Sequence, residues 1–193
     1  MDGTSEQRRA TAQAVRALLL AIGEDPERPG LQRTPERVAE AARELLGGVG
    51  RDPVPALAAG RIPAPQAAVQ PVLLRGMRFR SVCEHHLLPF TGAVSIAYVP
   101  GAHIVGLGRL HDLLETVSCR LTLQERMGDE LVDALMAGLE ARGALALVEA
   151  VHGCVALRGA RHERGDVVTV SARGSLAEPA GRAEVMALLG RGA

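Results

Sequence analysis

The stretch SVCEHHLLPFTGAVSIAYVPG, residues 81–101, places a predicted strand beside a cluster of reactive side chains. Within it, residues 91–99 alternate in a way that predicts a half-buried strand, because successive strand residues point to opposite faces of a sheet. The apolar members of the alternation are Val94, Ile96 and Tyr98. Residues 69–83 also have strand character, so the two segments could pair as neighbours.

The segments after this stretch predict two helices and then two more strands. Two apolar stripes at helical spacing predict the helices, and Gly143 is expected to close the second one. The stripes are Leu110, Leu113, Leu114 and Val117, then Met127, Leu131, Leu135 and Leu139. Residues 144–159 and 166–175 return to strand character, and residues 181–189 predict a short terminal helix. The order predicts an α+β fold, an antiparallel sheet with two helices inserted between strand pairs.

The N-terminal segment predicts a helical arm. Residues 5–22 carry one apolar helical stripe, and Gly23 follows as a C-terminal cap. A second helix is predicted from Thr34, a natural N-cap, with Pro35 in the first helical position and Gly47 at the end.

Residues 48–68 are rich in proline, glycine and alanine, and this composition predicts a connector without elements of its own. We therefore expect two parts. Residues 1–68 form the helical arm and connector, and residues 69–193 form the main domain.

The composition limits the classes of function. The chain has 193 residues and a formal net charge of zero, and all of its 22 basic residues are arginine. A balanced charge argues against a broad nucleic-acid or membrane surface, since both require a concentrated basic face. Three scattered cysteines and a charged N-terminal segment predict a cytoplasmic protein with reduced thiols.

Cysteine and histidine residues form a possible metal site. Cys83 and His86 have the C-x2-H spacing with which a turn presents two ligands, and Cys154 could supply a third. Three protein ligands plus water are typical of catalytic zinc, whereas structural sites usually have four protein ligands. The spacing alone leaves a structural site, or no site, open. His85 could carry protons or donate a hydrogen bond to a ligand.

The predicted strand at 144–159 has a reactive face. Alternation would place His152, Cys154, Ala156 and Arg158 on one side of the strand. Taken singly, Cys154 could be a small buried hydrophobe and His152 a partly buried structural histidine. As a set, they favour a site.

The segment TLQER, residues 122–126, has two interpretations. Thr122 and Glu125 have the S/T-x-x-E form of a capping box, which predicts a helix start. Alternatively, the Glu125 carboxylate could accept paired N–H donors such as those of a guanine. The sequence alone leaves both open.

Three segments in order resemble the GTP cyclohydrolase I family. They are CEHH at 83–86, QER at 124–126 and HGCVALRG at 152–159, and TPERVA at 34–39 resembles the family's N-terminal helix. The resemblance implies that residues 69–193 form a tunnelling fold. It also implies a homo-oligomer, typically a toroidal decamer with active sites between subunits.

The same resemblance implies the roles of the metal and histidine residues. Cys83, His86 and Cys154 would bind Zn2+, which would activate a water molecule for attack on C8 of the guanine ring. His85 and His152 would then move protons as the ring opens and formate leaves. The implied reaction converts GTP to dihydroneopterin triphosphate.

The substrate contacts are also implied by resemblance. Glu125, with Gln124 beside it, would hold the pyrimidine edge of the guanine. Arg37, Arg109 and Arg158 would bind the triphosphate, and guanidinium groups suit phosphate oxygens.

Two residues depart from the family pattern at GLGRLHD, residues 106–112. Gly108 removes a hydroxyl expected near the ribose and phosphates, and Asp112 replaces a cation with an anion. We expect one of three outcomes: a GTP cyclohydrolase I in which neighbouring arginines compensate, a paralogue that takes fewer phosphates or stops before ribose rearrangement, or a non-catalytic zinc-stabilised oligomer.

Overall fold

In the computed structural model, which describes residues 3–65, 70–158 and 165–190, the chain divides into the units Met1–Gly47 and Gly48–Ala193. The first unit contains helices α1 (Gly3–Ala21) and α2 (Thr34–Leu45), as predicted. Gly23 has a φ of 87°, and the Glu24 N–H donates to Leu19, so the glycine ends α1 as expected. The predicted Thr34 cap is wrong by one residue, because Arg33 occupies the cap position and Thr34 is already helical.

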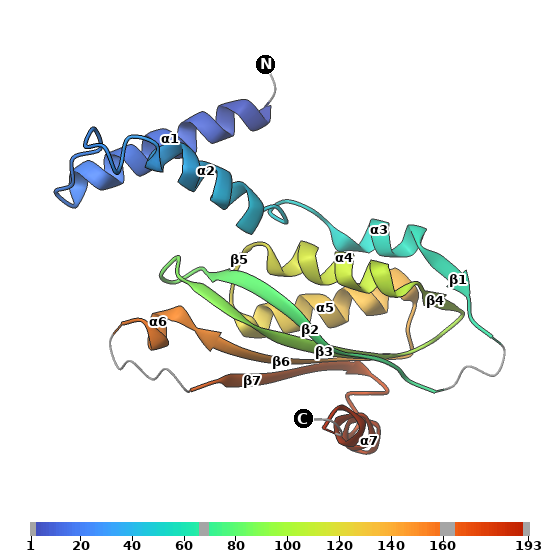
Figure 1. The fold of residues 1–193 in the computed structure, drawn as a ribbon. Helices are drawn as coiled ribbons and strands as arrows, with labels where there is room; N and C mark the ends of the chain where they lie inside the picture. Colours follow the sequence, from blue (N-terminus) through green and yellow to red (C-terminus); the bar gives the residue numbers. More distant parts are fainter. Residues whose placement is uncertain (1–2, 66–69, 159–164, 191–193) are drawn as a thin grey trace. The chain divides into compact units, whose positions relative to one another are not determined.

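The second unit is built on a five-stranded sheet with the order β5-β2-β3-β6-β7 (Figure 1). Its strands are β2 (Val72–Cys83), β3 (Pro89–Val99), β5 (Leu121–Thr122), β6 (Gly143–His152) and β7 (Val167–Gly174). All neighbours are antiparallel except β2 and β5. Helices α4 (Leu107–Ser118) and α5 (Gln124–Leu139) separate the two strand pairs in sequence and cover one face of the sheet. This confirms the predicted α+β order.

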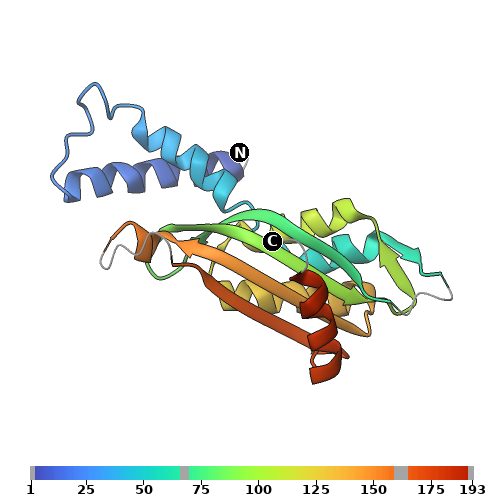
Figure 2. The ribbon, with the colours of Figure 1, turned by 60° about the horizontal axis from the view of Figure 1, so that its bottom comes forward.

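Both faces of the sheet are covered. Val94, Ile96 and Tyr98 are buried in the core that α4 and α5 share with the sheet, which confirms their predicted alternation. On the opposite face, helix α7 (Pro179–Leu189) lies across the strands (Figure 2), and its Val185 packs against Leu145 of β6. None of the helices among the described residues is long and apolar enough to cross a bilayer.

The prediction that residues 48–68 are a connector is wrong. They contain helix α3 (Pro53–Ala59) and strand β1 (Arg61–Pro63), which pairs with β4 (His103–Val105). Proline is compatible with the first turn of a helix, and the Asp52 carboxylate caps this one by accepting from the Val54 N–H at 2.9 Å. The proline-rich composition therefore concealed a capped helix.

Two boundaries near β6 also differ from the prediction. Helix α5 ends at Leu139, followed by Glu140 with a φ of 53°, and Gly143 begins β6 instead of closing the helix. The strand predicted for 144–159 ends at His152, where the short helix α6 (Gly153–Ala156) follows.

Helix α3 anchors the start of the second unit to α5. Leu57 is buried, and a Cβ at Gly138 of α5 would lie only 2.8 Å from the Leu57 side chain. The absence of a side chain at Gly138 therefore lets α3 approach α5 closely.

We predict that Leu57→Ala destabilises the protein by about 2–5 kcal/mol, because the truncation leaves a cavity in a packed core. The free energy of unfolding from denaturant titration measures this loss. Leu107→Ala, at an exposed leucine of α4, is the control and is expected to change stability by less than about 0.5 kcal/mol. Equal losses in the two variants would contradict the packing role of α3.

Candidate metal centre

The side chains of Cys83, His86 and Cys154 meet at one end of the sheet. Their ligand atoms all lie within 4.8 Å of one another, so the group could hold a metal ion. Cys83 is the buried last residue of β2, His86 is exposed in the turn that follows, and Cys154 is partly buried in α6. The structure thus brings Cys154 to a pair of residues that lies about 70 positions earlier in the sequence.

The turn after β2 is held by backbone bonds and by one ion pair. The Leu87 N–H donates to Cys83 and the Cys83 N–H to Leu88, both at 2.9 Å. The Glu84 carboxylate accepts hydrogen bonds from both terminal nitrogens of Arg126, at 2.6 Å and 3.1 Å. This ion pair connects the turn to α5. This ion pair was not predicted from the sequence, although Glu84 and Arg126 lie inside the CEHH and QER segments.

Cys154 reaches the cluster by a route that differs from the predicted one. The expected shared strand face of His152, Cys154, Ala156 and Arg158 does not form, because the chain turns into α6 at Gly153. A Cβ at Gly153 would lie 2.6 Å from the Pro89 carbonyl oxygen, so this close approach requires glycine.

His152 is fixed by two neighbours. Its ring stacks on Phe90 with centroids 4.7 Å apart and 3° between the planes, and its Nε2 lies 2.8 Å from the Gln124 Oε1. Burial lowers the pKa of His152 because it disfavours the charged imidazole, while the Glu125 carboxylate acts in the opposite direction. His85 is exposed in the turn, with its ring 6.3 Å from that of His86.

The two residues that open α5 point to different environments. Gln124 is 1% exposed and Glu125 is exposed to solvent. The capping box does not form: Leu123 holds the cap position, and the Thr122 hydroxyl donates to the Leu123 carbonyl at 3.2 Å. Glu125 makes no hydrogen bond or ion pair with another described residue, so its carboxylate is available to a ligand.

Comparison with known proteins identifies the family. Residues 11–190 match the sequence profile of GTP cyclohydrolase I. The chain belongs to the GTP cyclohydrolase I family. This membership identifies the α+β sheet as a tunnelling fold.

Named relatives are similar in sequence to this chain over nearly its whole length. GTP cyclohydrolase 1 of Leifsonia xyli subsp. xyli is 48% identical over 180 residues, covering 93% of this chain and 94% of that protein. GTP cyclohydrolase 1 of Dehalococcoides mccartyi (strain ATCC BAA-2266) is 40% identical over 183 residues, covering 93% and 95%. Among solved structures, the apo form of the archaeosine synthase QueF-Like matches at 18% identity with a TM-score of 0.44, covering 58% of this chain and 97% of that one. That likeness is too weak to bear on either fold or function.

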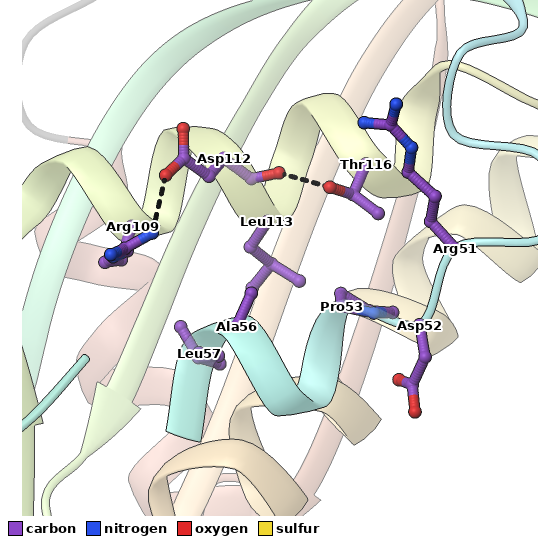
Figure 3. Close-up of a pocket in the computed structure, with 9 residues that line it drawn as sticks. All are labelled: Arg51, Asp52, Pro53, Ala56, Leu57, Arg109, Asp112, Leu113 and Thr116. Carbon is purple, nitrogen blue, oxygen red and sulfur yellow. Dashed lines mark hydrogen bonds and ion pairs between the residues drawn. The ribbon is translucent and has the colours of Figure 1, made fainter. Parts of the chain in front are cut away.

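Arg109 and Asp112 of the segment GLGRLHD help to line a cavity of about 350 Å³ between α3 and α4 (Figure 3). Arg109 and Asp112 form an ion pair on its rim, with 3.5 Å between Nη1 and Oδ2. Arg51 extends along α4 on the Thr116 side, whereas the Asp52 carboxylate points away from α4. The Arg51 guanidinium forms no ion pair or hydrogen bond with any other residue that the structure describes.

Arg120 fixes the segment that carries Arg51. Its guanidinium donates to the carbonyl oxygens of Gly48, Arg51 and Thr116, and it pairs with Glu130 at 2.8 Å. Arg51 was not predicted as a site residue, because residues 48–68 were expected to be a connector without elements of its own.

The remaining expected phosphate contacts lie elsewhere. Arg37 belongs to α2 of the first unit, and exposed Arg158 follows α6. Gly108 lies in the first turn of α4, and nothing comes within 4 Å of the position that its Cβ would take. The structure therefore does not bring Arg158 into the cavity that Arg109 lines.

We predict that Gly153→Ala weakens metal binding about tenfold, because α6 must shift away from Pro89 and carry Cys154 with it. Competition between the protein and a chromogenic chelator for Zn2+ measures the affinity. Gly106→Ala is the matched control, since nothing lies within 4 Å of its Cβ position and its φ is −66°. Unchanged zinc affinity in Gly153→Ala would show that Cys154 does not depend on this approach.

Proposed function

We propose that this chain converts GTP to dihydroneopterin triphosphate and formate with a Zn2+ ion held by Cys83, His86 and Cys154. Family membership supports the reaction, since its named relatives are GTP cyclohydrolases. The observation that carries the proposal is the convergence of the three ligand atoms within 4.8 Å in a chain of this family.

The donor set fits zinc. Two thiolates and one imidazole are ligands that zinc prefers, and the three ligand atoms lie within 4.8 Å of one another. Among the residues that the structure describes, three belong to the group, and three protein ligands would leave a tetrahedral position for water. When bound, zinc supplies a Lewis acid that makes water nucleophilic near neutral pH.

The side chains around the cluster have complementary tasks. The exposed Glu125 carboxylate accepts hydrogen bonds from N1 and the 2-amino group of guanine, and Gln124 lies beside it in the first turn of α5. His85 and His152 carry the protons that the ring nitrogens gain as C8 leaves as formate. Burial lowers the pKa of His152 and so favours the neutral imidazole, the form that can accept a proton.

The triphosphate is bound by arginines, with one change from the family pattern. Arg37, Arg109 and Arg158 are the expected cations, and Asp112 partly neutralises Arg109 through their ion pair. Arg51, on the same cavity and without an ion-pair partner among the described residues, compensates for the lost cation. The Asp112–Arg109 pair also favours a second candidate function, ring opening of a guanine nucleotide with fewer phosphates.

The proposed active unit is a homo-oligomer, a decamer with sites between subunits, in which residues 69–193 carry the catalytic groups. Its three free cysteines suit the reducing cytoplasm, where we place it. Light scattering after size-exclusion chromatography measures the subunit number.

The deciding experiment supplies the zinc-loaded protein with GTP, GDP, GMP and guanosine, and measures formate and the fluorescence of oxidised pterin. The proposal expects pterin and formate from GTP. A preference for fewer phosphates would favour the second candidate function, and formate without pterin would indicate a paralogue that stops before ribose rearrangement. Retained zinc with neither product would indicate a non-catalytic oligomer.

We predict that Cys154→Ala abolishes zinc retention and turnover together, because two remaining ligands do not hold zinc against dialysis. Metal content by elemental analysis and formate release are the two measurements. Cys119→Ala removes a buried thiol outside the cluster and is expected to retain both. Persistence of zinc in Cys154→Ala would remove this ligand assignment.

We predict that Arg51→Gln raises the KM for GTP about fivefold and that Asp112→Asn lowers it by a similar factor, as expected for partly solvated charge contacts of about 1 kcal/mol. Arg142→Gln makes the same charge change at a separate cavity and serves as the control. A higher KM in Asp112→Asn would mean that the carboxylate assists nucleotide binding instead of opposing it.

A further inference from the structure

We infer that Gln124 is a positioning residue that holds the neutral His152 ring in the tautomer protonated at Nε2, which leaves the lone pair on Nδ1. The tautomer follows from hydrogen-bond geometry alone. Its use in the reaction rests on the proposed function, in which His152 carries protons.

The orientation of the Gln124 amide is fixed by its nitrogen. The two hydrogens on its Nε2 are shared among three acceptors, the carbonyl oxygens of Val148 at 3.0 Å and Val167 at 2.9 Å and the Thr169 hydroxyl at 3.1 Å. Carbonyl oxygens only accept hydrogen bonds, so the flipped amide would place its oxygen against two other acceptors. With Gln124 only 1% exposed, water cannot relieve that conflict.

The fixed amide then determines the proton on the histidine. The Gln124 Oε1 is turned toward the His152 Nε2 at 2.8 Å, and an amide oxygen can only accept. The Nε2 must therefore carry the hydrogen. In the neutral imidazole, a protonated Nε2 leaves the lone pair on Nδ1.

Phe90 fixes the remaining freedom of the ring. The two rings are stacked with 3° between their planes, and Phe90 is itself buried and packed edge-on against Phe79 at 5.7 Å. The stack sets the plane of the imidazole, and the bond to Gln124 sets its rotation within that plane. The direction of the Nδ1 lone pair is thus determined before any ligand arrives.

Gln124 and Glu125 have different roles although they are adjacent. The Gln124 amide nitrogen donates hydrogen bonds to β6 and β7, and its oxygen accepts one from His152. Glu125 makes no hydrogen bond or ion pair with another described residue. Gln124 therefore acts through His152, and Glu125 is left to contact the guanine.

The test is nuclear magnetic resonance of the full-length, zinc-loaded protein labelled with ¹⁵N in the histidine rings. The His152 signals are assigned by their loss in His152→Asn. We expect a protonated Nε2 and an unprotonated Nδ1 in the unsubstituted protein. Thr169→Val should keep this tautomer, because the two carbonyl acceptors still orient the amide.

Gln124→Met keeps the side-chain length but removes both hydrogen-bonding groups. We expect it to populate both tautomers and to release formate with a kcat about 100-fold lower, while the KM for GTP changes less than threefold. Zinc content and the unfolding midpoint, measured on the same sample, report whether the fold survives.

The outcomes separate this inference from the proposed function. A protonated Nδ1 in the unsubstituted protein overturns the inference, and so does an unchanged tautomer in folded Gln124→Met. If the protein releases no formate from GTP, the proposed function fails, while the ring ¹⁵N signals still decide the tautomer.

Discussion

The antiparallel pairing of β3 with β6 is the constraint on which the candidate site depends. Its register sets Phe90 opposite His152, which places the end of β6 beside the start of β3 and close to the end of β2. The stacked ring, the close approach of α6 and the convergence of Cys154 with Cys83 and His86 all follow from this register. A slip of one residue would turn His152 to the other face of the sheet.

The sequence predicted the elements whose patterns are periodic. The alternation of β3 and the apolar stripes of α4 and α5 survive in the structure, because each element buries one face against a single core. The prediction of elements was wrong where the local composition favours a linker but tertiary contacts stabilise a helix. Residues 48–68 look like a linker, yet Asp52 caps α3 and Leu57 packs on α5, a contact that only the folded chain reveals.

The candidate site was predictable in its residue types but not in its geometry. Cys83, His86 and Cys154 could be named from their segments, yet the helical turn that presents Cys154 depends on the approach of Gly153 to Pro89. The sequence also places Gln124 and Glu125 side by side without indicating which of them is buried. Their burial separates them, because the Gln124 amide has partners on β6 and β7 that lie far along the chain.

Cys83 of β2 pairs with Thr122 of β5 in parallel register, and α5 begins two residues later at Gln124. This short link constrains the rotation of α5 relative to the sheet. Each residue advances a helix by about 100°, so one amino acid inserted or deleted after Thr122 would rotate Gln124 and Glu125 relative to the sheet. An insertion would carry the amide to the exposed position of Glu125, and a deletion would bring the carboxylate to the buried position of Gln124, where it would face carbonyl oxygens. Length variation among relatives should therefore spare this link and accumulate elsewhere.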